Sequence, residues 1–135
     1  MKIDGGCQCG HITYRAEIDP ATASICHCTD CQTFSGSAFR TSVPVVEGTL
    51  EFTSGEVKAY IKTAESGAKR IQGFCPECGT HIYATAVGDE PKIYRVRTST
   101  ARQRDELPPQ VQIWFRSARP WATELGTLRK VDKQQ

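Results

Sequence analysis

The chain has 135 residues, of which 39% are hydrophobic and 24% are charged, and its formal net charge is +2. This size and balance predict a folded protein with a single domain over residues 1–135, and they exclude the disordered, collagen-like and low-complexity classes. The charge counts seven cysteines as neutral and turns slightly negative if all seven bind two zinc ions as thiolates, so it gives no support for a nucleic-acid partner.

The first ten residues, MKIDGGCQCG, contain no apolar signal-peptide core, and no segment approaches the roughly 18 apolar residues of a membrane span. The sequence therefore predicts a cytoplasmic protein without a membrane partner. Because the cytoplasm keeps thiols reduced, seven cysteines there indicate metal binding or catalysis before disulfides.

The predicted elements are mainly short strands. Residues 12–18 alternate between apolar and polar side chains, which is the period of a half-buried strand, and Asp19-Pro20 is a turn that ends it. A short helical turn is expected at 30–34, and the charged, proline-ended segment 100–110 is expected to be a loop with at most one helical turn. The tail 127–135 is expected to be loosely ordered. Further strands are predicted at 38–43, 49–53, 57–61, 71–74, 82–87, 93–97 and 111–115.

This pattern predicts an all-β fold of small sheets whose limited core needs support from bound metal. The seven cysteines supply that possibility, because they fall into three closely spaced groups. These groups are Cys7 and Cys9 in GCQCG, Cys26, Cys28 and Cys31 in CHCTDC, and Cys75 and Cys78 in FCPECGTH.

The last of these groups has the most specific motif. Two thiolates separated by two residues, with Pro76 setting the turn and Gly79 free to take positive φ, are typical of a zinc knuckle. Buried free thiols are the alternative for this pair. A knuckle needs two more ligands, which the spacing allows to come from Cys7 and Cys9 or from the central group.

Counting favours the pair Cys7 and Cys9, because a closed four-thiolate site then leaves the central three cysteines together on a second metal with an open position. The alternative for the central group is a second structural site completed by a histidine. His27 is expected to point away from its cysteine neighbours, and His11 and His81 are expected near the closed site, where they can hydrogen-bond to sulfur.

Two other features have a structural and a functional interpretation. Trp114 and Trp121 are expected to pack in the core or at an edge rather than to bind a ligand. Four arginines are expected to form a solvated face, and a phosphate or carboxylate clamp is the alternative. They are Arg95, Arg97, Arg102 and Arg104.

Four stretches together, GCQCG, CHCTDCQ followed by SGSAF, FCPECGTHIY and PQVQIWFRSARPW, resemble the glutathione-dependent formaldehyde-activating family. The resemblance runs from about residue 5 to residue 122. It implies the β-tent fold, in which several small antiparallel sheets are stapled by two zinc ions. It also implies a structural zinc on Cys7, Cys9, Cys75 and Cys78, and a catalytic zinc on Cys26, Cys28 and Cys31.

The resemblance further implies an activity. The family condenses formaldehyde with glutathione to S-hydroxymethylglutathione, formally a carbon-sulfur lyase reaction, so a small thiol and an aldehyde are the expected partners. The competing hypotheses are a zinc-stabilised binding module without catalytic activity and a protein that passes zinc on. A binding module for nucleic acid would need a dense basic or aromatic patch, whereas only 8% of the residues are aromatic and the 17 basic residues are interspersed with 15 acidic ones.

Overall fold

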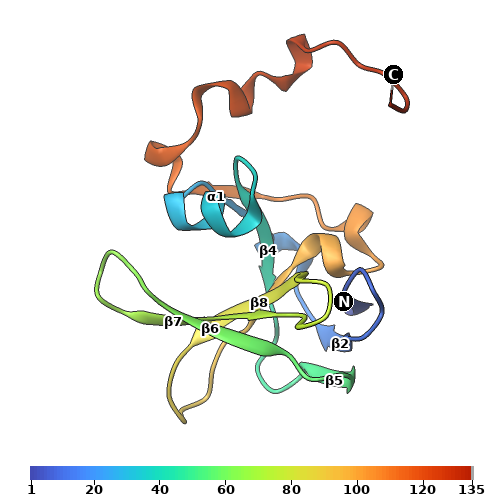
Figure 1. The fold of residues 1–135 in the computed structure, drawn as a ribbon, viewed down its shortest axis with the longest axis vertical. Coiled ribbons are helices and arrows are strands. Elements are labelled where there is room, and N and C mark those ends of the chain that lie inside the picture. Colours follow the sequence, from blue (N-terminus) through green and yellow to red (C-terminus); the bar gives the residue numbers. More distant parts are fainter. Residues whose placement is uncertain (135) are drawn as a thin grey trace.

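The structure is a computed structural model that describes residues 1–134. Within that range the chain forms one α-helix and ten strands, joined by loops and short 3₁₀ turns (Figure 1). In chain order the elements are β1 Lys2–Gly6, β2 Thr13–Glu17, β3 Ser24–Cys26, α1 Thr29–Ser35, β4 Arg40–Pro44, β5 Glu51–Ser54, β6 Lys58–Thr63, β7 Lys69–Phe74, β8 His81–Ala86, β9 Arg95–Arg97 and β10 Val111–Ile113.

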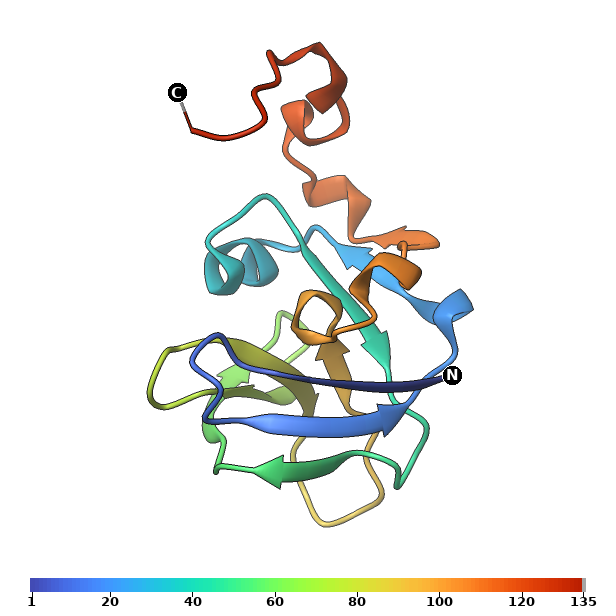
Figure 2. The same ribbon diagram turned by 90° about the vertical axis from the view of Figure 1, so that its right-hand side faces the viewer.

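The strands form two sheets in the part of the chain that the structure describes. The smaller has the order β1-β2-β5, and the larger has the order β10-β3-β4-β9-β8-β7-β6. In Figure 2 the three strands of the smaller sheet lie together in the lower part of the molecule. All strand pairs are antiparallel except β10 with β3. The predicted all-β class is confirmed, with two sheets, one parallel pair and one helix as its details.

The core joins the two sheets. Tyr14 of β2 is buried together with Val43 of β4 and Val96 of β9, and the Tyr14 hydroxyl lies 2.8 Å from the Thr100 hydroxyl. Along β2 the side chains of Tyr14 and Ala16 are buried while Arg15 is exposed, as its alternating sequence predicts. The sequence periodicity therefore identified the face of this strand that packs inward.

Two strands were not predicted. β1 has the sequence KIDGG, whose paired glycines hide any alternation, and β3 is three residues long. The predicted turn at 30–34 becomes the helix α1, and the segment 100–110 contains the expected single 3₁₀ turn, Arg104–Glu106.

Gly5 of β1 is required by a close backbone approach. A Cβ there would overlap the carbonyl oxygen of Thr100 and would lie 2.8 Å from the Cα of Ala101. We expect Gly5→Ala to lower the free energy of unfolding by about 1–3 kcal/mol, the usual cost of overpacking. Urea unfolding measures it as a lower midpoint. Gly126→Ala, where an added Cβ meets nothing within 4 Å, is the control, and equal midpoints for the two variants would contradict the close approach.

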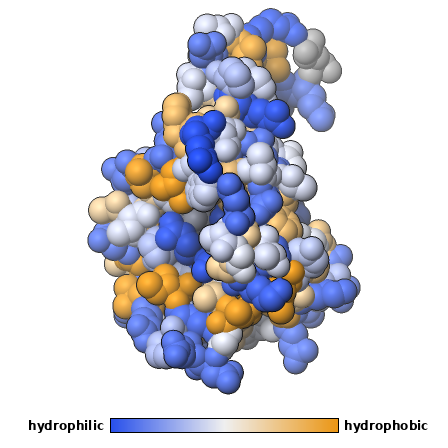
Figure 3. All heavy atoms as spheres, turned by 90° about the vertical axis from the view of Figure 1, so that its left-hand side faces the viewer, coloured by the Kyte–Doolittle hydropathy of each residue, from blue (hydrophilic) through white to orange (hydrophobic). Residues whose placement is uncertain are grey.

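Residues 115–134 form an arm that leaves the body of the molecule and carries the 3₁₀ turns Phe115–Ser117, Pro120–Thr123 and Leu125–Thr127 (Figures 1 and 2). Trp121 on this arm is 57% exposed and Trp114 just before it is 44% exposed, so neither tryptophan packs in the core and that part of the prediction is wrong. Figure 3 shows apolar groups on one face of the molecule interrupted by hydrophilic residues. The loose order expected for the tail stays a prediction, and Gln135 lies outside the described residues.

No helix in residues 1–134 is both long enough and apolar enough to cross a membrane.

Candidate metal centres

Four cysteines from two turns that are far apart in the sequence come together at one point. The Sγ atoms of Cys7, Cys9, Cys75 and Cys78 all lie within 4.8 Å of one another. The Sγ of Cys9 is 3.6 Å from that of Cys7 and 3.8 Å from that of Cys75. A tetrahedral zinc with bonds of about 2.3 Å holds its sulfur ligands about 3.8 Å apart. The four sulfur atoms therefore fit a closed tetrahedral zinc site.

The first pair of ligands lies on a tight turn between β1 and β2. The backbone N–H of Cys7 donates to the carbonyl of Ile12 at 3.0 Å, and the N–H of Ile12 donates to the Cys7 sulfur at 3.1 Å. Gly10 closes the turn with a φ of 82°, which few other residues adopt. An amide pointing at sulfur favours the thiolate, which is the form that binds metal.

The second pair lies on a matching turn between β7 and β8. Here the N–H of Cys75 donates to the carbonyl of Thr80 at 2.9 Å, the N–H of Glu77 points at the Cys75 sulfur at 3.4 Å, and Gly79 has a φ of 78°. The Thr80 hydroxyl, 3.2 Å from the Cys78 sulfur, is the main cause that lowers the pKa of that thiol to about 5. The turn thus favours the thiolate of Cys78 at neutral pH.

The central three cysteines form a separate group, in which the Sγ atoms again lie within 4.8 Å of one another. Cys26 ends β3, Cys28 is the N-cap of α1, and Cys31 is in the first turn of that helix. The N–H of Cys31 donates to the Cys28 sulfur at 3.3 Å. The strand-to-helix turn therefore aims three nearby side chains at one point.

The central group favours a thiolate at Cys26. The neighbouring Cys31 thiol donates a hydrogen bond to Cys26, and this is the main cause that lowers the pKa of Cys26 to about 5, with the positive charge of Arg40 adding to it. Donating that bond raises the pKa of Cys31. A divalent ion would stabilise the negative charge on sulfur, so all three cysteines could then be thiolates together.

The three sulfurs line a cavity of about 670 Å³ between α1, the β6–β7 hairpin and residues 113–117. We call it the triad cavity. On one side it is bounded by Trp114, whose φ of 55° makes it the only described non-glycine residue with positive φ. Glu65 also lines the cavity and pairs with Arg116 at 3.5 Å, and the Arg116 guanidinium lies 4.9 Å from the centre of the Trp114 ring. A residue other than glycine that is held at positive φ, as Trp114 is, often lies at a functional site.

No histidine, aspartate or glutamate joins the three central sulfurs as a fourth ligand in the described residues. His27 is buried, but its Nε2 lies 2.8 Å from the Gln112 side-chain oxygen, and its ring packs edge-on against Phe39 and Phe115. The side chain points away from a metal position, as expected. The geometry does not support the alternative of a site completed by histidine.

The other two histidines do not take up the expected contacts with sulfur. The His81 ring packs against Phe34 and Phe74, with ring centroids 5.6 and 5.9 Å apart, and His11 is exposed. Among the described residues neither ring hydrogen-bonds to a cysteine.

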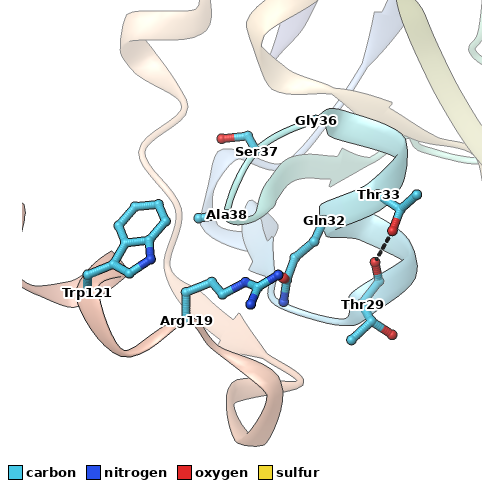
Figure 4. Close-up of a pocket in the computed structure, with 8 residues that line it drawn as sticks. All are labelled: Thr29, Gln32, Thr33, Gly36, Ser37, Ala38, Arg119 and Trp121. Atoms are coloured by element: carbon cyan, nitrogen blue, oxygen red, sulfur yellow. Dashed lines mark hydrogen bonds between the residues drawn. The ribbon is translucent and has the colours of Figure 1, made fainter.

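A second hollow lies between α1 and the arm (Figure 4). It has a volume of about 580 Å³, and in Figure 4 Arg119 of the arm reaches toward Gln32 of the helix while Trp121 lies opposite Ala38. The Gln32 amide donates to the carbonyls of His27 and Ser117, which fixes the start of the arm to the turn that holds the cysteines. Because no cysteine lines this hollow, the chemistry belongs to the triad cavity.

The sequence interpretation of the arginines is corrected in part. Arg97 is 6% exposed and Arg95 is half-buried in the wall of the triad cavity, so these two do not form a solvated face. Arg102 is exposed and pairs with Asp4 at 2.7 Å, and Arg104 is exposed, as expected. Sequence reasoning also missed Arg40 and Arg70, which line the same cavity.

Comparison with known proteins identifies the family to which the chain belongs. The family model described as "Glutathione-dependent formaldehyde-activating enzyme" matches residues 2–117. The chain belongs to the glutathione-dependent formaldehyde-activating enzyme family. Membership together with the two cysteine groups indicates a zinc-binding domain of this family's type.

A solved structure supports the fold. The crystal structure of a Rhodobacter sphaeroides protein superposes with a TM-score of 0.60 at 18% sequence identity, covering 81% of this chain and 98% of that one. At this identity the likeness shows a shared fold. No curated protein matches the chain.

Proposed function

We propose that the protein is a zinc-dependent enzyme that joins a small aldehyde to a thiol, with formaldehyde and glutathione as the substrates and S-hydroxymethylglutathione as the product. The observation that carries this proposal is the triad cavity: Cys26, Cys28 and Cys31 lie in its wall, and no fourth protein ligand accompanies them in the described residues. Family membership supports the same chemistry.

A zinc ion held by the three sulfurs would supply Lewis acidity at its fourth position, which lowers the pKa of a thiol or polarises a carbonyl oxygen. The residues of the chain would hold and orient this centre: Cys28 caps α1, Cys26 and Cys31 are buried in the cavity wall, and Arg40 favours the thiolate at Cys26. In the reaction the thiol sulfur forms a bond to the aldehyde carbon, the carbonyl π bond breaks, and the thiol proton ends on the oxygen. The reaction needs no oxidant or reductant.

The four-cysteine group is proposed to hold the structural zinc. It joins the β1–β2 turn to the β7–β8 turn, which belong to different sheets, and the Gln8 N–H adds a 3.1 Å hydrogen bond to the Thr80 hydroxyl across the junction. Four sulfurs complete a tetrahedral ion, so this centre has no position for a substrate.

The proposal is tested by the rate at which ¹³C-formaldehyde exchanges with S-hydroxymethylglutathione, measured by NMR exchange spectroscopy. We expect metal-replete protein to raise the rate above that of the uncatalysed addition and Cys28→Ser to remove the increase. Ser37→Ala, an exposed residue in the other hollow, is the control and should behave as wild type. A rate equal to the uncatalysed one at every protein concentration would favour the binding-module hypothesis.

The proposal also predicts the metal content. Native mass spectrometry of metal-replete protein is expected to find two zinc ions per chain, because the seven sulfurs form a group of four and a group of three. Cys28→Ser should retain one ion. A single ion in the wild-type protein, or disulfides under reducing conditions, would contradict this assignment.

A further inference from the structure

The register of the large sheet places several cations on one face. Cys26 pairs with Arg40 across β3 and β4, and Arg95 of β9 pairs with Pro44, which lies on the same face of β4 as Arg40 because the two are an even number of residues apart. The same pairing continues through β8 to β7 and places Arg70 on this face, opposite Lys62 of β6.

These four cations all line the triad cavity. The Lys62 ammonium is neutralised by Asp30, 2.8 Å away. None of Arg40, Arg70 and Arg95 lies within 4.0 Å of a carboxylate in residues 1–134. We call these three the arginine cluster.

The neutral contacts of the arginine cluster leave much of its hydrogen-bonding capacity free. Arg95 donates to the Ser24 hydroxyl at 2.9 Å, and Arg40 reaches the Gln72 side-chain oxygen only at 3.5 Å. The Nε of Arg40 is buried without a partner, and the Arg70 side chain donates no hydrogen bond to a described residue. Partly buried cations without partners are costly, so their presence beside a cavity requires an explanation.

The negative charge of the cysteine thiolates balances only part of the positive charge of the arginine cluster. Three thiolates with one divalent ion carry a single net negative charge, and Arg40, which is paired with Cys26 in the sheet, is placed to balance it. Arg70 and Arg95 then remain in excess. Burial, followed by repulsion from Arg40, lowers the pKa of both, which agrees with a cluster of like charges.

We propose that Arg70 and Arg95, assisted by Arg40, bind a carboxylate of the small molecule that enters the triad cavity, so that the site selects an anionic substrate. The inference rests on the proposed function, because it takes the triad cavity as the substrate site. Arginine suits this role, since its planar guanidinium donates two parallel hydrogen bonds to one carboxylate. With formaldehyde as the aldehyde the carboxylate belongs to the thiol, because formaldehyde has none, and a carboxylate-bearing aldehyde in its place is the other source that the test distinguishes.

The test compares ligands that differ only in charge, by isothermal titration of metal-replete protein. In the thiol arm, 3-mercaptopropionate is compared with its methyl ester, and in the aldehyde arm glyoxylate is compared with methyl glyoxylate. In one arm we expect the acid to bind about tenfold more tightly than the ester, which is the usual contribution of a charged hydrogen-bonded pair. The arm that shows this difference identifies whether the carboxylate belongs to the thiol or to the aldehyde. Arg70→Gln and Arg95→Gln should each remove most of the preference at unchanged zinc content. Arg129→Gln, exposed on the arm, is the control and should retain it.

A further ligand separates this inference from the proposed function. 3-(Methylthio)propionate keeps the carboxylate but has no thiol proton. The protein's affinity for this acid and for its methyl ester is measured by NMR chemical shifts. The preference for the acid should depend on Arg70 and Arg95 even if the protein does not catalyse the addition. Equal affinity for acid and ester in both arms, or a preference that survives both arginine substitutions, would overturn the proposal. Catalysis without such a preference would leave the proposed function standing and refute only the arginine cluster.

Discussion

Replacing Cys78 with serine is expected to unfold the protein, whereas replacing Cys28 with serine is expected to leave it folded. Cys78 belongs to the group that joins the β1–β2 turn to the β7–β8 turn, so a metal held there would link two sheets. Structural zinc contributes about 10–16 kcal/mol in small zinc domains, and a whole domain is stable by only about 5–15 kcal/mol. If the ion is lost together with one of its four ligands, the lost folding free energy is as large as the net stability of the domain.

Cys28 is the matched control because it belongs to a group confined to one strand-to-helix turn. Its replacement by serine keeps a hydroxyl that can still cap α1, so the expected cost to stability is small. Circular dichroism on heating should show no cooperative transition for Cys78→Ser and a transition close to wild type for Cys28→Ser. An equal loss of melting temperature in the two variants would contradict the division between a structural and a catalytic group.

The second large effect concerns ligand binding. Reduced glutathione is expected to bind metal-replete protein and to release about one proton per chain near neutral pH, because a metal ion stabilises the thiolate over the thiol. S-methylglutathione has the same carboxylates but no thiol, so it should bind far more weakly and release no proton. Isothermal titration in two buffers of different ionisation enthalpy measures both quantities.

Cys28→Ser serves as the control for this titration, since it should abolish proton release while the protein remains folded. Absence of both heat and proton release at millimolar thiol would refute thiol activation, and the fold would be unaffected. Similar affinities for glutathione and S-methylglutathione would indicate that the carboxylates alone carry binding.

The two cysteine groups could be predicted from the sequence because metal ligands are few, specific in type and closely spaced. CHCTDC places three cysteines on one turn, and FCPECG contains the glycine that its turn requires at Gly79. The partner of the Cys75 and Cys78 pair followed only from counting, and the structure brings Cys7 and Cys9 to it. Strands with clear alternation, such as β2, were equally accessible from sequence.

The arginine cluster could not be predicted in the same way. Arg40, Arg70 and Arg95 lie on three strands far apart in the chain, and only the register of the sheet brings them to one face. The exposure of Trp121 was missed for a related reason, because the apolar character of a residue does not reveal whether another segment covers it. Features that depend on tertiary placement therefore required the structure.

We propose that a metal held by the three-cysteine group keeps one coordination position for a substrate thiol. The most direct measurement is a crystal structure of the metal-replete protein soaked with reduced glutathione. We expect a metal bound by Cys26, Cys28 and Cys31 whose fourth ligand is the glutathione sulfur at about 2.3 Å, inside the triad cavity. A fourth ligand supplied by a protein side chain, or glutathione bound with its sulfur away from this metal, would contradict it.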